Sequence, residues 1–189
     1  TTPRNWQDVA ISAETGANQV TCVSGGFLYL STNTGSSWVS SSINIDGVAT
    51  QTTNRAWKAI AVSANGQYGL ACVNNGYLYI SSNSCASWIS STVNIDGSST
   101  QTTNRLWQDV GMSANGKYQV ACVGTSGLIY YSKNYGANWS SLTAAGTNAW
   151  SSIALSENGS TITATTNDAS GGAWVYAMPD DQYYIPGLL

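Results

Sequence analysis

The sequence predicts an all-β fold made of about four copies of one repeat, each copy folding as a four-stranded antiparallel sheet. Four similar segments begin at Trp6, Trp57, Trp107 and Trp150. Within each copy, short runs rich in Val, Ile, Tyr and Trp alternate with Gly-, Asn- and Ser-rich segments, which is the composition of half-buried strands and the turns that join them. No segment shows helical periodicity over a useful length.

The elements of one copy follow in a fixed order. The first strand runs from the leading Trp to the Ser of the pattern WxxVAxS, and in three copies an Asn-Gly pair follows, which accommodates the positive φ angles of a tight hairpin. The second strand carries YxxACV, and the third carries GxLYIS after a Gly-rich turn. A second tryptophan begins the fourth strand in three copies, at Trp38, Trp88 and Trp139.

A radial array of such sheets explains why the copies resemble each other, whereas a β-sandwich does not. We therefore expect a small β-propeller of about four blades, forming a single domain over residues 1–189. The blades are expected at about 4–46, 55–97, 105–146 and 148–189.

The fourth copy is degenerate. Trp174 falls in its third strand, and its last strand would have to come from residues 182–189. Four blades are few for a propeller, and imperfect closure would leave an exposed edge that could pair with another chain.

Charge and hydropathy exclude two classes of partner. The chain has 6 Lys and Arg against 9 Asp and Glu, so it lacks the clustered cations that nucleic-acid binding needs. No apolar run approaches the ~18–20 residues of a membrane helix, so we expect no membrane insertion. The polar surface favours a secreted, virion or cell-surface location. The chain begins Thr-Thr-Pro, which suggests a processed or cropped N-terminus.

Catalytic groups are scarce. The chain has no histidine and therefore lacks the commonest general base and transition-metal ligand. Asp8 and Asp109 occupy equivalent repeat positions. A glycosidase needs two carboxylates in different environments about 5–10 Å apart, and equivalent residues on separate blades are poor candidates. We expect no catalytic activity, metal site or cofactor.

Three cysteines recur at intervals of 50 residues, Cys22, Cys72 and Cys122, in the strings VTCV, LACV and VACV. Equivalent positions in separate repeats predict equivalent places in the core, so we expect buried, free thiols rather than disulfide partners. Cys85 lies outside this series and is also expected to be free.

The turn between the third and fourth strands carries a specific string, which reads STNTGSSW (31–38), SSNSCASW (81–88) and SKNYGANW (132–139). These strings resemble the Asp box, or bacterial neuraminidase repeat, S-x-D-x-G-x-x-W. That motif occurs in sialidases, sortilin-like receptors, some glucanases and photosystem assembly factors. The matches cover most of residues 6 to 139.

The resemblance implies a structural turn at the blade periphery. In the family, the Asp carboxylate accepts backbone N–H bonds, the Gly takes a positive φ and the Trp packs between blades. Asn replaces Asp in all three copies and can still accept such bonds, whereas Cys85 replaces Gly and leaves the geometry of its turn open. The implied structural residues are Ser31, Asn33, Gly35, Trp38, Ser81, Asn83, Trp88, Ser132, Asn134, Gly136 and Trp139.

A sialidase reading is the least favoured alternative. The resemblance implies an arginine triad, a Tyr nucleophile, a Glu partner and an Asp acid/base in such enzymes. The three arginines here, Arg4, Arg55 and Arg105, all stand two residues before a leading Trp. That symmetry is typical of a structural or repeated-site role, because a catalytic triad draws on non-equivalent positions.

The links between blades carry the predicted binding sites, on the face opposite the Asp-box turns. Segments 44–55 and 94–105 are nearly identical, NIDGVATQTTNR and NIDGSSTQTTNR. Unstructured connections of this length are uncommon and often functional. After the third blade the link shrinks to about 143–148 and loses both Asp and Arg.

Each long link would place polar groups for sugar hydroxyls beside an aromatic ring for the C–H face of the sugar. The two predicted sites are Asp46, Gln51, Asn54, Arg55 and Trp57, and Asp96, Gln101, Asn104, Arg105 and Trp107. In the alternative interpretation, Asp-Gly only makes a turn and Arg and Asp form an interblade ion pair.

The sequence thus favours a non-catalytic, lectin-like module, with a glycan or a protein surface as partner. The competing hypothesis is a self-assembling structural subunit of an extracellular filament, surface layer or virion.

Overall fold

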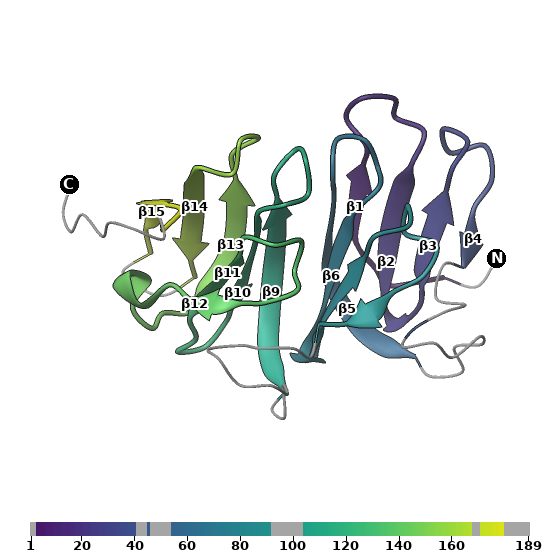
Figure 1. Ribbon diagram of the computed structural model, residues 1–189. Coiled ribbons are helices and arrows are strands. Elements are labelled where there is room, and N and C mark those ends of the chain that lie inside the picture. Colours follow the sequence, from purple (N-terminus) through teal and green to yellow (C-terminus); the bar gives the residue numbers. More distant parts are fainter. Residues whose placement is uncertain (1–2, 41–44, 46–53, 92–103, 168–170, 180–189) are drawn as a thin grey trace.

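The computed structural model describes residues 3–40, 45, 54–91, 104–167 and 171–179. Within these ranges the fold is all-β, and four successive sheet units follow the four sequence repeats (Figure 1). One short 3-10 helix, Thr143–Ala145, interrupts the strands of the described part.

Four strands build each of the first three units, and the last strand of each is only two residues long. The first unit holds β1 (Trp6–Ile11), β2 (Gln19–Gly26), β3 (Leu28–Ser31) and β4 (Val39–Ser40). The second holds β5 (Arg55–Val62), β6 (Gly69–Gly76), β7 (Leu78–Ser81) and β8 (Ile89–Ser90). The third holds β9 (Arg105–Met112), β10 (Gln119–Val123), β11 (Ile129–Ser132) and β12 (Ser140–Ser141).

The fourth unit has three strands in the described residues, β13 (Trp150–Leu155), β14 (Thr161–Thr166) and β15 (Ala173–Ala177). Trp174 lies in the third of them, as predicted. The final strand expected at 182–189 lies outside the described residues.

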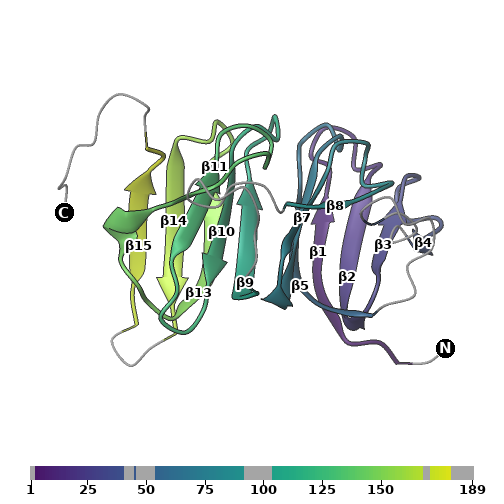
Figure 2. The ribbon, with the colours of Figure 1, turned by 60° about the horizontal axis from the view of Figure 1, so that its bottom comes forward.

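Each unit is an antiparallel meander, and the first three units are also joined edge to edge. The end of β2 pairs with the start of β5, and the end of β6 pairs with the start of β9. The strands β13, β14 and β15 form a separate sheet, so no pairing among the described residues closes the fourth unit onto the first. The first and fourth units lie at opposite ends of the row of sheets (Figures 1 and 2).

A chain of backbone hydrogen bonds links the turns that follow the first strand of each unit. The N–H of Glu14 donates to the carbonyl of Ala64 at 2.9 Å, Ala64 donates to Ala114 at 2.8 Å, and Ala114 donates to Glu157 at 2.8 Å. Because one bond joins each neighbouring pair, this ladder holds all four units in the same register.

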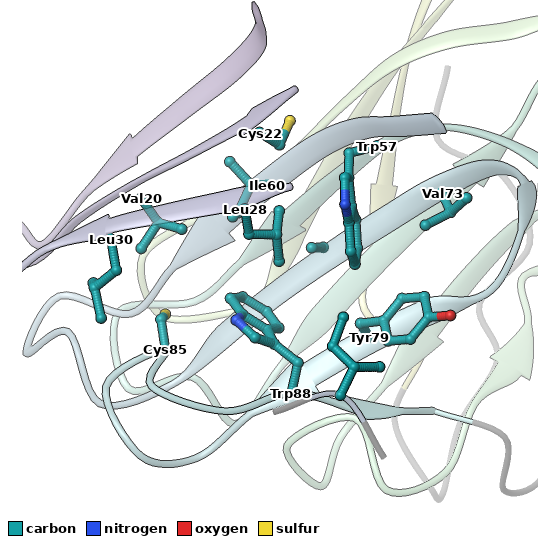
Figure 3. Packing of buried hydrophobic residues seen from close by; sticks show 12 residues of the cluster. Val20, Cys22, Leu28, Leu30, Trp57, Ile60, Val73, Tyr79, Cys85 and Trp88 are labelled. Carbon is teal, nitrogen blue, oxygen red and sulfur yellow. The ribbon is translucent and has the colours of Figure 1, made fainter. Parts of the chain in front are cut away.

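The core lies between the units. We call the side of a unit that carries its leading Trp the Trp face, and the other side the back face. At the first junction, Trp57, Ile60 and Trp88 of the second unit pack on Val20 and Leu28 from the back face of the first (Figure 3). The next two junctions repeat this arrangement, so the Trp faces of the second, third and fourth units are each buried by the unit before.

The Asn-Gly turns differ from the predicted hairpin in one respect. Gly66 has a φ of 74° and Gly116 a φ of 77°, but neither preceding Asn has a positive φ. Instead, the Asn65 side chain bonds back to the turn, where its Oδ1 accepts the Ser63 hydroxyl at 2.8 Å. The Asn therefore acts as a side-chain cap of the turn.

Candidate functional site

The predicted binding links lie largely outside the described residues, which leaves out Asp46, Gln51, Asp96 and Gln101. The structure does describe their last residues. Asn54 and Asn104 are exposed and directly precede the strands β5 and β9. The corresponding arginines begin these strands, at the end opposite the Asp-box turns.

The two arginine side chains have the same geometry, with the guanidinium packed over a tyrosine ring. The Arg55 guanidinium carbon lies 5.3 Å from the centre of the Tyr79 ring, and that of Arg105 lies 5.1 Å from the Tyr130 ring. The Arg55 Nε also donates to the Tyr79 hydroxyl at 3.0 Å. Cation–π contact and packing therefore orient both side chains before any ligand arrives.

One nitrogen of each guanidinium has no hydrogen-bond partner in the described part of the chain. The Nη1 atoms of Arg55 and Arg105 are buried and have no hydrogen-bond partner among the described residues. A buried polar group without a partner loses its hydration and gains nothing in return. An incoming oxygen atom would satisfy each of these donors.

Trp57 and Trp107 do not lie where the sugar-stacking prediction placed them. Both side chains are 0% exposed, so neither ring can stack on a ligand. They lie between units and make edge contacts with Tyr79 and Tyr130, at centroid distances of 5.0 and 5.3 Å. The Trp107 Nε1 donates to the Gly76 carbonyl at 3.1 Å. Their periodic spacing reflects the repeated core, because every unit needs a large side chain to fill its junction.

The equivalent carboxylates Asp8 and Asp109 join neighbouring units. Asp8 accepts the backbone N–H of Ile60 at 2.8 Å, and Asp109 accepts that of Ile153 at 2.8 Å. Asp109 also accepts the Ser152 hydroxyl at 2.6 Å. Burial raises the pKa of Asp8, and the two backbone N–H donors oppose that rise only in part. These carboxylates are therefore occupied by structural bonds.

The three turns 31–38, 81–88 and 132–139, whose strings resemble the Asp box, share one hydrogen-bond pattern. In the first, the Ser31 hydroxyl donates to Asn33 Oδ1 at 2.9 Å and accepts the Gly35 N–H at 2.9 Å. Asn33 Oδ1 also accepts the Ser37 N–H at 2.9 Å. The bonds recur around Asn83 and Asn134. The Asn side chain thus accepts the bonds expected of the Asp carboxylate.

Cys85 keeps the geometry of a glycine turn. Its φ is 62°, against 83° for Gly35 and 80° for Gly136. Its N–H donates to the Ser81 hydroxyl at 3.1 Å, as in the other two turns. The thiol is buried, and burial raises its pKa to about 12. The predicted free thiols are confirmed for all four cysteines, each of them buried.

Two features escaped the sequence analysis. One is a shallow groove of about 430 Å³ at the end of the blades that carries these turns, and its lining includes Lys117, Lys133, Asn158 and Ser160. The other is the Trp face of the first unit, which no other unit covers in the described structure. We call it the open face and define it by Trp6, Val9, Ile11 and Trp38.

Exposure separates the open face from its repeat equivalents. Trp6 is 50% exposed, whereas Trp57 and Trp107 are 0% exposed and Trp150 is 1% exposed. Val9 is 65% exposed, whereas Ile60 is 4% exposed. The residue types of the first repeat do not reveal this difference, because they are the same as in the buried repeats; the only signal was the low number of repeats, which predicted imperfect closure.

Other classes of site find no support in the described residues. No group of three or more Asp, Glu or Cys side chains in these ranges could hold a metal ion. None of the described helical segments has the length and apolarity to cross a bilayer.

No protein-family model matches the chain, and no curated protein matches it in sequence. Solved structures do match. A GH74 enzyme from Niastella koreensis is 21% identical, with a TM-score of 0.63, and the match covers 93% of this chain and 23% of that one. YCF48 bound to D1 peptide is 16% identical, with a TM-score of 0.62, and the match covers 92% and 52% of the two chains.

The Swd1 β-propeller domain of Myceliophteria thermophila is 10% identical, with a TM-score of 0.60, and the match covers 92% of this chain and 51% of that one. This chain thus spans from about a quarter to about half of the length of these structures. At such low identities the likeness shows the fold alone. The chain is an all-β repeat protein whose sheet units are arranged like the blades of a β-propeller.

Proposed function

We propose that this chain is a non-catalytic propeller module of about four blades that binds an oxygen-rich ligand, and that the ligand is a glycan. The observation that carries the proposal is the matched pair Arg55 and Arg105. Each side chain is oriented by a tyrosine and keeps a buried Nη1 without a partner among the described residues. A guanidinium only donates hydrogen bonds, so its complement is an oxygen acceptor such as a sugar hydroxyl or carboxylate.

The neighbours of these arginines support a polyhydroxylated ligand. Asn54 and Asn104 precede them in the chain and are exposed. An amide both donates and accepts, which suits a hydroxyl, and together with arginine it offers the mixed polar set that fixes a sugar's orientation. Because Trp57 and Trp107 are buried, hydrogen bonds rather than ring stacking would carry the affinity.

Two equivalent sites on adjacent blades favour a ligand with repeated units. A single site without an aromatic platform is expected to bind weakly, since much of its hydrogen-bond energy replaces bonds to water. A ligand that engages both sites gains from the high effective concentration of its second binding group. We therefore expect oligosaccharides to bind more tightly than monosaccharides.

The bonding of the carboxylates supports the non-catalytic part of the proposal. Asp8 and Asp109 accept backbone N–H groups from the next blade, which occupies the atoms that a general base would need. The sequence supplies no histidine as a substitute. Hydrolysis of a fluorogenic sialoside or glucoside by the purified chain would contradict this part.

The test is a glycan array, followed by calorimetric titration of the best oligosaccharide. Arg55→Gln and Arg105→Gln should each weaken binding at least about 10-fold, the usual effect of removing a charged hydrogen-bond donor. The matched control is Lys117→Gln, which removes the same charge at the opposite end of the blades. Binding that survives both arginine substitutions, or a failure to bind any glycan, would overturn the proposal.

A second candidate function is that of a structural subunit, and the uncovered Trp face of the first blade favours it. This candidate predicts defined assemblies that form without sugar. It does not compete with the arginine sites, because they lie at the start of other blades' strands.

A further inference from the structure

The open face has the composition of an interblade junction without its partner. Trp6, Val9 and Trp38 are 50%, 65% and 40% exposed. Their repeat equivalents in the second blade, Trp57, Ile60 and Trp88, are at most 4% exposed. The same residue types therefore form a closed core in one blade and face solvent in another, where contiguous apolar surface marks an interaction site.

At the opposite end of the row of blades, the back face of the fourth blade differs in composition from the back face of the second. On the back face of the fourth blade, Thr163 and Thr165 replace Leu70 and Cys72 of the second blade, and Ala173 replaces Leu78. Thr163 and Ala173 are exposed, whereas Leu70, Cys72 and Leu78 are 0% exposed. Repeat proteins end in units with a polar outer face of this kind. Among the described residues, the back face of the fourth blade is thus less apolar than the equivalent faces of the other blades, whereas the Trp face of the first blade keeps its apolar residues.

This asymmetry points to a particular arrangement of subunits. A head-to-tail contact would place the apolar open face on the more polar back face of another copy's fourth blade. A contact between two open faces instead buries both apolar surfaces and leaves the more polar back face of a fourth blade at each outer end. We propose that two copies of this chain associate through their open faces, first blade against first blade, in an isologous twofold dimer.

The charges beside β1 fit a twofold axis that crosses this strand. Arg4 precedes β1 and Glu14 follows it, so opposite charges flank the two ends of the strand. A perpendicular twofold axis runs the two copies of β1 antiparallel. Arg4 of one copy then lies toward Glu14 of the other, which gives two complementary charge pairs at the rim.

The apolar area is sufficient for a dimer. Half-exposed tryptophans at positions 6 and 38, with Val9 and Ile11, present roughly 300–400 Å² of apolar surface per copy, taking ~200 Å² for a tryptophan. Two copies would bury about 600–800 Å². Because a little over half of a typical interface is apolar, this corresponds to a total interface of about 1,000–1,400 Å².

The dimer does not depend on the glycan proposal, because Arg55 and Arg105 lie on other blades. Arg4, the arginine of the first blade, packs over the ring of Tyr29 as its equivalents pack over Tyr79 and Tyr130, with its guanidinium carbon 4.8 Å from the ring centre, and it is not one of the two proposed glycan sites. A variant that loses the dimer should therefore still bind oligosaccharide, and a variant that no longer binds oligosaccharide should still dimerise.

The test uses two matched valines. Val9 is 65% exposed on the open face, and Val175 is 62% exposed on the back face of the fourth blade.

The intact chain should be a dimer by light scattering and sedimentation at tens of micromolar. Val9→Glu should be monomeric, with its dissociation constant raised at least about 100-fold, because two glutamates would face each other near the axis. Val175→Glu should remain dimeric. Both substitutions are at exposed positions, so neither should disturb the folding of the subunit. At concentrations where the parent chain is monomeric, all three proteins should have the same melting temperature.

Four outcomes would overturn the proposal. A monomeric parent chain at all accessible concentrations would mean that the open face has another occupant. Loss of the dimer in both variants would indicate a head-to-tail ring, and a dimer in both would place the contact elsewhere. Arg4→Glu should weaken the dimer several-fold, and adding Glu14→Arg should restore it. Failure of this charge swap to restore dimerisation would contradict the antiparallel arrangement.

Discussion

The thiol of Cys85 occupies the space that a side chain at Gly69 would need. A Cβ on Gly69 would lie 2.6 Å from Cys85 Sγ and 2.7 Å from Trp88 Cη2. In the first blade, Gln19 stands at the position of Gly69 and Gly35 at the position of Cys85. The larger residue therefore comes from the second strand in the first blade and from the turn in the second blade. A Cβ on Gly35 would lie 3.1 Å from Gln19 Oε1. The third blade repeats the arrangement of the first, with Gln119 and Gly136. One site in each of the first three blades thus accommodates one side chain, which comes either from the second strand or from the turn after the third strand.

Gly69→Gln should therefore lower the free energy of unfolding by about 1–3 kcal/mol, the usual cost of overpacking a filled site. Combining it with Cys85→Gly should recover much of that loss, because the double variant recreates the pair found in the first and third blades. Urea denaturation of the four proteins in this cycle should give a coupling of at least about 1 kcal/mol. Additive effects would contradict the exchange.

Reactivity of the thiols should report on folding. Burial raises the pKa of Cys22, Cys85 and Cys122 to about 12, and that of Cys72 well above its ordinary value. The reactive thiolate is therefore absent at pH 8, and the sulfurs are also inaccessible. An aromatic disulfide reagent should label no cysteine in the native chain and all four in urea. Fast native labelling of any cysteine would show that its junction opens.

Asn83 should be replaceable by Asp but not by Ala. Its Oδ1 accepts the Ser81 hydroxyl and the Ser87 N–H, each at 3.0 Å, and its Nδ2 donates to the Ser87 hydroxyl at 2.7 Å. Asn83→Ala removes these bonds and should cost about 1 kcal/mol. Asn83→Asp keeps both acceptor roles, and the Ser87 hydroxyl can rotate to donate, so its effect should stay within about 0.5 kcal/mol. Thermal and urea unfolding would measure both, and equal effects would contradict the acceptor role of Oδ1.

The titration of Asp8 should contribute to the pH dependence of the free energy of unfolding. Burial raises its pKa in the folded state above the ordinary value of 3.8 for an aspartate. The folded state therefore favours the protonated form, and the stability from this group is present below pH 3.8 and lost as the pH rises through the raised value. Asp8→Asn cannot titrate. Its stability relative to the parent should thus improve between pH 3 and pH 7, on top of a constant loss from one missing acceptor. Urea midpoints at both pH values measure this, and a change of opposite sign would contradict the raised pKa.

Much of the fold could be read from the repeat. The leading tryptophans, the buried cysteines and the turn strings recur because every blade needs the same side chains at its junction and the same bonds in its turns. The blade pattern therefore appears in the sequence, and so does the degeneracy of the fourth copy. The sequence was misleading about Trp57 and Trp107, because a repeated aromatic in a core and one in a binding site have the same spacing.

The sequence by itself determined the all-β class, the four repeats, the order of the strands within each and the buried cysteines, since these follow from local pattern and repetition. Only the tertiary structure decided which junctions are complete. Trp6 and Trp57 occupy the same repeat position, yet one is 50% exposed and the other 0%. Burial depends on whether another blade lies in front of a residue, and this is a property of the assembled row of sheets rather than of any segment within it.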